Sequence, residues 1–331
     1  MVEPEQLTLL PDADWSPASL EAQLGSIDWS YSRRTVLNRC PRQYYFEYFG
    51  ASKRQAEDDP SKRLLMDLKS LSNRDLRVGD LVHGSIARYF RAAQKGFLMS
   101  VGDLVPQAVA RFRADRDYSR LLAAGQSDPP ANQPEVVALR EYVYADPEVE
   151  RLMDEAEARL RFALNAFGAL PALEPFRFAG RGLDALVEWN ISVRGLPCRV
   201  HGKVDLAFGT SSRAFVVDWK LGRVELAGED SLQLAVYALW ACQQFSCSPE
   251  HVKLIKAFLG SGEIREYQAN HELMATARLR IVQDAERMAA VHDYGERGIV
   301  AAFTPASRRR VCAQCAYLRA CPEGTEALTN G

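Results

Sequence analysis

The stretch HGKVDLAFGTSSRAFVVDWK, His201 to Lys220, decides the fold because it predicts two β-strands joined by a tight turn. Its β-branched and aromatic residues alternate with polar ones, and turn-forming residues interrupt the pattern in the middle. With the turn centred on the two serines, Asp205 and Asp218 should lie opposite each other on neighbouring strands. Because side chains alternate along a strand, Asp218 and Lys220 should share one face, and Trp219 should occupy the other.

This hairpin would bring two carboxylates and one ammonium group together. Neighbouring carboxylates repel each other, and a divalent cation such as Mg2+ or Mn2+ relieves that repulsion while acting as a Lewis acid toward a phosphate oxygen. Lys220 would orient or activate the attacking water. A plainer interpretation makes Asp218 and Lys220 a surface ion pair at a strand end, and the hairpin alone does not separate the two.

The flanking segments extend the pattern into an α/β fold, with helices before the sheet and a βαβ connection within it. Three strands are expected first, then a helix, a further hairpin and a long helix. The expected elements are helices at 32–50 (interrupted near Pro41), 76–96 and onward to about 167, strands at 183–195, 198–209 and 213–222, a helix at 231–245, strands at 251–260 and 263–268, and a helix at about 270–290.

The chain is expected to have four parts. They are a flexible arm at 1–26, a helical part at 27–175, a sheet core at 176–295 and a cysteine-rich tail at 296–331.

Three residues outside the hairpin are candidates for the same site. Gln233 and Tyr237 are four residues apart on a predicted helix, so both could lean over the strand ends toward a phosphate or the lysine. An ordinary amphipathic helix with a half-buried tyrosine would explain them as well. His83 lies in an N-terminal helix, and a lone histidine is more often structural than a metal ligand.

Four motifs in this order resemble the RecB-type branch of the PD-(D/E)XK nuclease superfamily: GDLVHG at 79–84, HGKVDLAF at 201–208, VVDWK at 216–220 and QLAVY at 233–237. The resemblance implies a restriction-endonuclease-like mixed β-sheet flanked by helices, and it spans about residues 30 to 322. Asp218 stands where many relatives have glutamate, a change that keeps the charge and shortens the reach.

Roles for individual residues follow from this resemblance. His83, Asp205 and Asp218 would bind the catalytic metal, and Lys220, Gln233 and Tyr237 would complete the catalytic set. Glu188, on the first predicted strand, could assist, but we interpret it as an exposed strand acid.

A second group of potential metal ligands lies in the tail segment CAQCAYLRAC, where Cys312, Cys315 and Cys321 follow a C-x2-C-x5-C spacing. A metal centre of this kind needs four thiolates. The chain resembles the iron–sulfur members of the family, the CRISPR-adaptation and AddB-type exonucleases. These place one cysteine before the core, and Cys40 matches that position. The resemblance therefore implies a [4Fe–4S] cluster, although spacing alone leaves zinc open, with disulfides a distant third.

The cluster would staple the two ends of the chain together. Basic residues near the cysteines, among them Arg33 and Arg34, could then gather beside Tyr44, Tyr45 and Tyr317 into a rim that holds phosphates and stacks unpaired bases. A solvated basic face is the alternative interpretation.

The composition limits the class of protein to which the chain can belong. With 331 residues, 47% hydrophobic content and a net charge of −2, the chain is typical of a globular protein, without a secretory signal or a long apolar run. We expect a cytoplasmic protein with no membrane association.

The leading hypothesis is a DNA nuclease that acts on single strands or free ends in repair, recombination or antiviral defence. The alternative is a non-catalytic iron–sulfur module that binds nucleic acid and partners a helicase or another defence protein.

Overall fold

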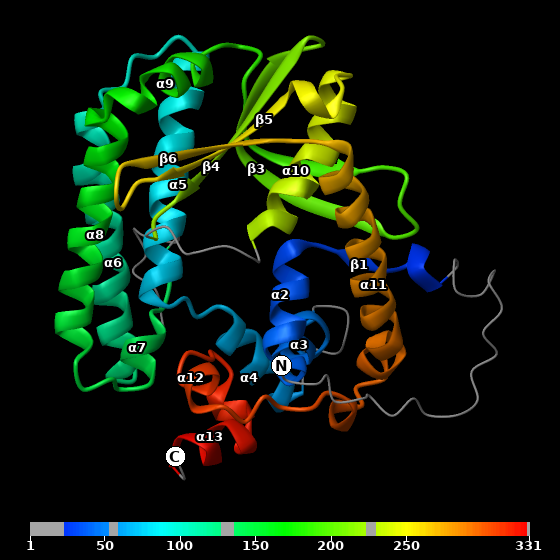
Figure 1. The fold of residues 1–331 in the computed structure, drawn as a ribbon. Helices are drawn as coiled ribbons and strands as arrows, with labels where there is room; N and C mark the ends of the chain where they lie inside the picture. Colours follow the sequence, from blue (N-terminus) through cyan, green and yellow to red (C-terminus); the bar gives the residue numbers. More distant parts are fainter. Residues whose placement is uncertain (1–22, 53–58, 127–135, 223–229, 330–331) are drawn as a thin grey trace.

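The computed structural model describes residues 23–52, 59–126, 136–222 and 230–329, and these form a mixed six-stranded sheet with helices on both faces (Figure 1). The sheet order is β1-β3-β4-β5-β6, and β2 pairs with the opposite edge of β3. β1 is parallel to β3 and β4 is parallel to β5, whereas the other pairs are antiparallel. The expected α/β fold class, with a mixed sheet and a large helical N-terminal part, is confirmed.

The strands are β1 (Asp28–Trp29), β2 (Leu186–Val193), β3 (Arg199–Thr210), β4 (Arg213–Lys220), β5 (Val252–Phe258) and β6 (Glu263–Gln268). The longer helices are α2 (Tyr31–Arg39), α4 (Pro60–Lys69), α5 (Arg74–Gln94), α6 (Leu104–Ala123), α8 (Val149–Ala169), α10 (Asp230–Phe245) and α11 (His271–Glu296). Shorter helices are α3 (Pro41–Tyr45), α7 (Arg140–Val143), α9 (Glu174–Gly180), α12 (Arg309–Cys312) and α13 (Pro322–Thr329).

Most of the expected elements are present, with shifted ends. The helix expected at 32–50 begins at Tyr31, is capped by the Ser30 side chain, and is interrupted before Pro41 as expected. Neither the short strand β1 nor helix α4 was among the expected elements. Most of the expected flexible arm lies outside the described residues. Within the described residues, no helix is long and apolar enough to cross a membrane.

The sheet separates two hydrophobic cores, because neighbouring residues of one strand point to opposite faces. Val216 of β4 packs into a first core with α2, α3, α10 and α11. Val217 and Trp219 pack into a second core with α5, α6 and α8, where the Trp219 and Phe167 rings meet edge to face at 5.7 Å. Helices α5, α6 and α8 therefore cover this face of the sheet, and His83 extends from α5 toward the hairpin.

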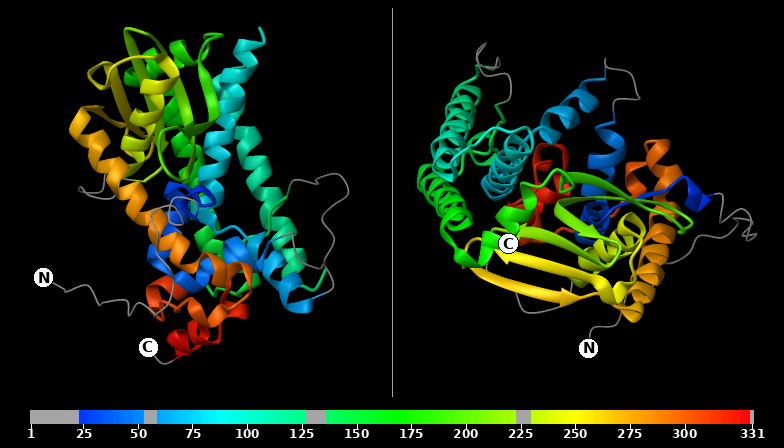
Figure 2. Two further views of the ribbon diagram at one scale, coloured as in Figure 1. Left: turned by 90° about the vertical axis from the view of Figure 1, so that its right-hand side faces the viewer. Right: turned by 90° about the horizontal axis from the view of Figure 1, so that it is seen from above.

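The C-terminal tail returns to the N-terminal helices, and both further views show α12 and α13 beside α3 and α4 (Figure 2). The Arg42 guanidinium donates to the Phe303 carbonyl oxygen at 2.8 Å and pairs with Glu323 at 3.3 Å. The Tyr317 hydroxyl donates to the Glu47 carboxylate at 2.6 Å, and its ring is fully buried. These contacts close the chain on itself.

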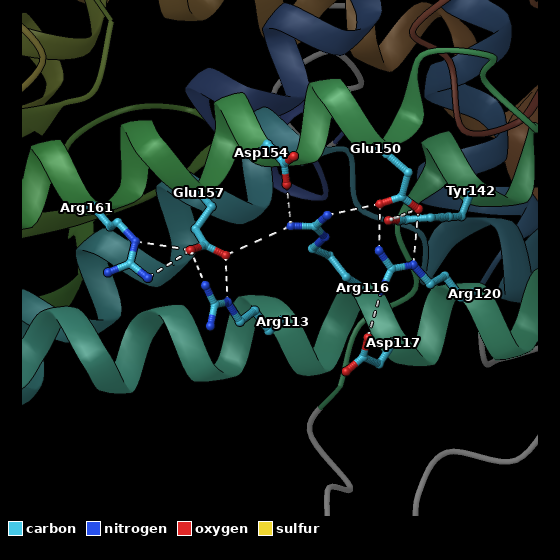
Figure 3. Close-up of polar contacts among 9 residues, drawn as sticks. All are labelled: Arg113, Arg116, Asp117, Arg120, Tyr142, Glu150, Asp154, Glu157 and Arg161. Atoms are coloured by element: carbon cyan, nitrogen blue, oxygen red, sulfur yellow. Dashed lines mark hydrogen bonds and ion pairs between the residues drawn. The ribbon is translucent and has the colours of Figure 1, made fainter.

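A row of ion pairs joins α6 to α8 along the side of the second core (Figure 3). Arg116 is only 11% exposed and contacts both Glu150 and Asp154 at 3.0 Å. Arg113 and Arg161 both bind Glu157 at 2.8 Å. Single exposed pairs contribute little, but arginines that share carboxylates fix the two helices in register.

Burial in the second core should determine the cost of removing an aromatic ring from α8. Phe167→Ala removes a fully buried ring between α8 and the sheet, and it should lower the free energy of unfolding by about 3–5 kcal/mol. Phe162→Ala, on the same helix but 56% exposed, is the matched control and should change it by less than about 1 kcal/mol. Urea unfolding followed by circular dichroism measures both, and equal losses would contradict this packing.

Candidate active site

The β3–β4 hairpin brings its two acids close together. The ladder runs from the pair Thr210–Arg213 to the pair Leu206–Val217, and Asp205 and Asp218 are the next residues on the two strands. The Trp219 backbone N–H donates to the Asp205 carboxylate at 2.7 Å, which fixes the orientation of that side chain. Both acids are buried, with 7% and 3% of their surface exposed.

Helix α5 brings His83 onto the same spot. Its Nδ1 lies 3.0 Å from Asp205 Oδ1 and 3.6 Å from Glu188 Oε1. The ligand atoms of His83, Glu188 and Asp205 all lie within 4.8 Å of one another, and among the described residues no other group of three His, Cys, Asp or Glu side chains does so. Helix α5 and strands β2 and β3 each supply one member.

The interpretation of Glu188 as an exposed strand acid is wrong. Its side chain is 11% exposed, lies beside His83 and pairs with Lys203. Glu188 faces Asp205 across the β2–β3 ladder, between the pairs Val187–Leu206 and Trp189–Val204. Its backbone has a φ of 46°, a left-handed conformation that a non-glycine residue adopts at an energetic cost and that is frequent at functional sites.

Lys220 and the two candidates on α10 form one hydrogen-bonded chain. Lys220 Nζ lies 2.8 Å from Asp218 Oδ2 and donates to Gln233 Oε1 at 3.1 Å. Gln233 Nε2 donates to the Tyr237 hydroxyl at 2.8 Å, and that hydroxyl donates to the Lys203 carbonyl oxygen at 3.0 Å. Gln233 and Tyr237 therefore hold Lys220 and the β3 backbone in place.

Burial and charge shift the ionisation of this group. Burial disfavours the charged form of His83, but Asp205 and Glu188 outweigh it and raise its pKa to about 10. Burial also works against ionisation of Glu188, yet His83 and Lys203 lower its pKa to about 2. Burial raises the pKa of Asp218 to about 6, opposed by Lys220 and reinforced by Asp205. Burial raises the pKa of Tyr237 well above its usual value, so it is a neutral donor.

The donor set fits a divalent cation. Two carboxylates and one imidazole nitrogen converge, and the buried Oε1 of Glu188 accepts no hydrogen bond from the residues that the structure describes. Carboxylate oxygens suit Mg2+ and Mn2+. Asp218, which we expected as a third ligand beside His83 and Asp205, lies outside the 4.8 Å group, with its carboxylate turned to Lys220.

Cys40, Cys312, Cys315 and Cys321 line one small cavity between α3 and the tail. Cys40 Sγ accepts hydrogen bonds from the backbone N–H groups of Gln43 and Ala306 at 3.5 and 3.4 Å, and Cys315 Sγ accepts one from Tyr317 at 3.4 Å. None of the chain's cysteines forms a disulfide. No three of the four sulfur atoms come within 4.8 Å of one another.

The tyrosines of the expected nucleic-acid rim do not lie on the surface. Tyr44, Tyr45 and Tyr317 are buried in the first core, where they pack the tail against α3. Arg34 is also buried and binds Asp284 at 2.8 Å. These side chains are therefore unable to stack on bases, and the rim in that form is wrong.

Of three comparisons with known proteins, one identifies a family. The family model described as "PD-(D/E)XK nuclease superfamily" matches residues 28–322. A search of curated proteins gives no match. A solved structure titled "Crystal structure of SSO0001" is 19% identical, with a TM-score of 0.27, over 56% of this chain and 81% of that one. The family match covers the sheet, His83, the hairpin and α10 together, and the chain belongs to the PD-(D/E)XK nuclease superfamily.

Proposed function

We propose that this chain is a metal-dependent deoxyribonuclease of the RecB type, which hydrolyses phosphodiester bonds at single strands or free ends. The observation that carries the proposal is the group of His83, Glu188 and Asp205 beside the ion pair of Asp218 and Lys220. A site that had lost catalysis would not need a half-buried histidine, three acids and an ordered lysine at one place. Antiviral defence, repair or recombination are the processes that use such an activity, in the cytoplasm and with a helicase or defence protein as partner.

The residues divide the work of hydrolysis. His83, Glu188 and Asp205 would hold the cation, Mg2+ or Mn2+, and Asp218 would complete the acidic site from the neighbouring strand. The bound cation would supply Lewis-acid stabilisation of a phosphate oxygen. Lys220, 28% exposed, orients the attacking water and offers positive charge to the phosphate as negative charge builds up. Gln233 and Tyr237 keep the lysine pointed at the reacting group.

We also propose that the four cysteines hold a [4Fe–4S] cluster. A single zinc ion with Zn–S bonds of ~2.3 Å would bring its four sulfurs to about 3.8 Å from one another. A cluster of several iron and sulfide ions holds its cysteines farther apart. The cavity that all four cysteines line supports a shared metal centre, and the family resemblance favours iron–sulfur over zinc. Backbone N–H groups directed at Cys40 and Cys315 stabilise ligated thiolates. The cluster would be a structural staple, because the catalytic carboxylates lie on other segments.

The catalytic assignment predicts loss of cleavage without loss of the fold. Asp218→Ala and Lys220→Ala should each reduce cleavage of end-labelled DNA at least about 100-fold. Lys253→Ala, which breaks an exposed ion pair on β5, is the control and should cleave normally. Rates are measured on single- and double-stranded substrates with Mg2+, with Mn2+ and with chelator. Full activity in an Asp218→Ala, Lys220→Ala double variant, or DNA binding without any cleavage by the wild type, would contradict the nuclease assignment.

The metal assignment predicts a change in cation affinity. His83→Ala and Glu188→Gln should each weaken Mn2+ binding roughly 10- to 100-fold, because each removes a donor from a set of three. Glu263→Gln, an exposed acid on β6, is the matched control. Electron paramagnetic resonance titration of Mn2+ in the absence of DNA measures the affinity directly. Unchanged affinity in Glu188→Gln would leave that residue with a structural role.

The cluster assignment predicts a coloured protein. Freshly purified protein should be brown, with a broad absorbance at about 400 nm. Cys315→Ala should lose the colour and lower the melting temperature, whereas Cys242→Ala, on α10, should keep both. A colourless protein with one zinc per chain, purified without air, would assign the site to zinc. A cysteine variant that stays stable and binds DNA but does not cut it would contradict the staple role.

A further inference from the structure

A groove of about 650 Å3 runs along the outer edge of the sheet beside the candidate active site. Strand β2 forms one wall and α5 forms the other, and the Arg91 guanidinium ties the walls together by donating to the Val187 carbonyl oxygen at 3.0 Å. Gln94 donates to three carbonyl oxygens of the segment before β2 and closes one end. Glu188 lines the groove and also belongs to the candidate metal site, so the two are continuous.

The side chains of β2 switch from one face of the sheet to the other at Glu188. Residues 187, 189 and 191 of a regular strand share one face. Here Val187 packs into the second core and Ile191 packs into the first core, on opposite faces of the sheet. The left-handed φ of Glu188 lies between them. The same irregularity therefore directs Glu188 toward His83 and leaves Trp189 at the edge of the sheet.

Trp189 lines the groove with 47% of its surface exposed, whereas Trp29, Trp219 and Trp240 are at most 4% exposed. No other aromatic ring among the described residues stacks on its indole. Leu183, 82% exposed, adds apolar surface to the same groove. Large exposed apolar side chains gathered in a groove mark a binding site more often than a packing defect.

We propose that this groove binds an unpaired nucleobase of the substrate strand, stacked on the indole of Trp189. The inference rests on the proposed function and names the substrate class of the same site. The groove offers the groups that bind a single strand. The Trp189 ring stacks on a base, the Arg91 guanidinium attracts the neighbouring phosphate, and the Asn190 amide contacts a base edge. Bases inside a duplex are already stacked on each other and do not enter it. The strand then passes Glu188 and reaches the candidate metal site.

The indole itself reports on the stacking. Trp15 lies outside the described residues, so a Trp15→Phe background leaves Trp189 as the exposed fluorophore. In chelator, which prevents cleavage, a ten-residue oligodeoxythymidine should quench the tryptophan emission of this protein. A Trp15→Phe, Trp189→Phe variant should show no quenching and bind within about three-fold of the background, because phenylalanine still stacks. An abasic oligonucleotide of the same length, which keeps only sugars and phosphates, should not quench.

Affinity gives a second measurement. Trp189→Ala should weaken binding of labelled single-stranded DNA about ten-fold in fluorescence anisotropy and leave binding of a blunt duplex unchanged. Phe162→Ala, which removes an exposed ring on α8 away from the groove, is the matched control. Quenching that is equal with the abasic strand, or a Trp189→Ala variant with wild-type affinity for single strands, overturns the proposal.

These binding measurements need no catalysis. If the wild type cleaves DNA and the indole is not quenched, the stacking site is wrong and the nuclease assignment stands. If the indole is quenched and the wild type never cleaves, the groove stands and the chain acts as a binding module.

Discussion

The register of one hairpin sets the positions of Asp205, Asp218 and Lys220. The β3–β4 ladder ends at the pair Leu206–Val217 with Asp205 and Asp218 directly beyond it, and a shift of one residue would turn each acid toward the opposite face of the sheet. The Trp219 amide reinforces this register by donating to Asp205, while the Trp219 ring anchors the opposite face against Phe167. The residues that pack the second core and the residues that form the site therefore alternate along the same strand, and neither set can move alone.

The second constraint comes from helix α5. His83 completes the site only if α5 stays at a fixed distance from the sheet, and α5 itself packs on α6 and α8 within the second core. The shared ion pairs between α6 and α8 hold that layer from its outer side (Figure 3). The large helical part thus has a clear physical role, because it supports the helix that carries His83.

Local pattern was sufficient to predict the hairpin, the central strands and the helix of Gln233 and Tyr237. Residues whose environment depends on distant segments were not predictable in this way. Glu188 was misjudged because alternation assumes a regular strand, and its left-handed φ breaks that rule. Tyr45 and Tyr317 were misjudged because they are buried by contacts between the N-terminal helices and a tail more than 250 residues downstream, where Tyr45 meets the Phe303 ring and Tyr317 binds Glu47. Cys40 was assigned to the same site as the three tail cysteines only through the family resemblance, since no sequence spacing relates it to them.

Because the tail packs against α3, two segments that contact each other in the folded protein are synthesised at very different times. Glu47 and its partner Tyr317 are separated by 270 residues, so at ~5–20 residues per second α3 waits roughly 15–55 s after leaving the ribosome before its partner is made. During that interval Tyr44, Tyr45 and Phe46 are without the surface that buries them in the finished protein. The N-terminal helices of a nascent chain would therefore be a client for a chaperone, and truncation before residue 303 would leave an aggregation-prone fragment with its sheet already complete.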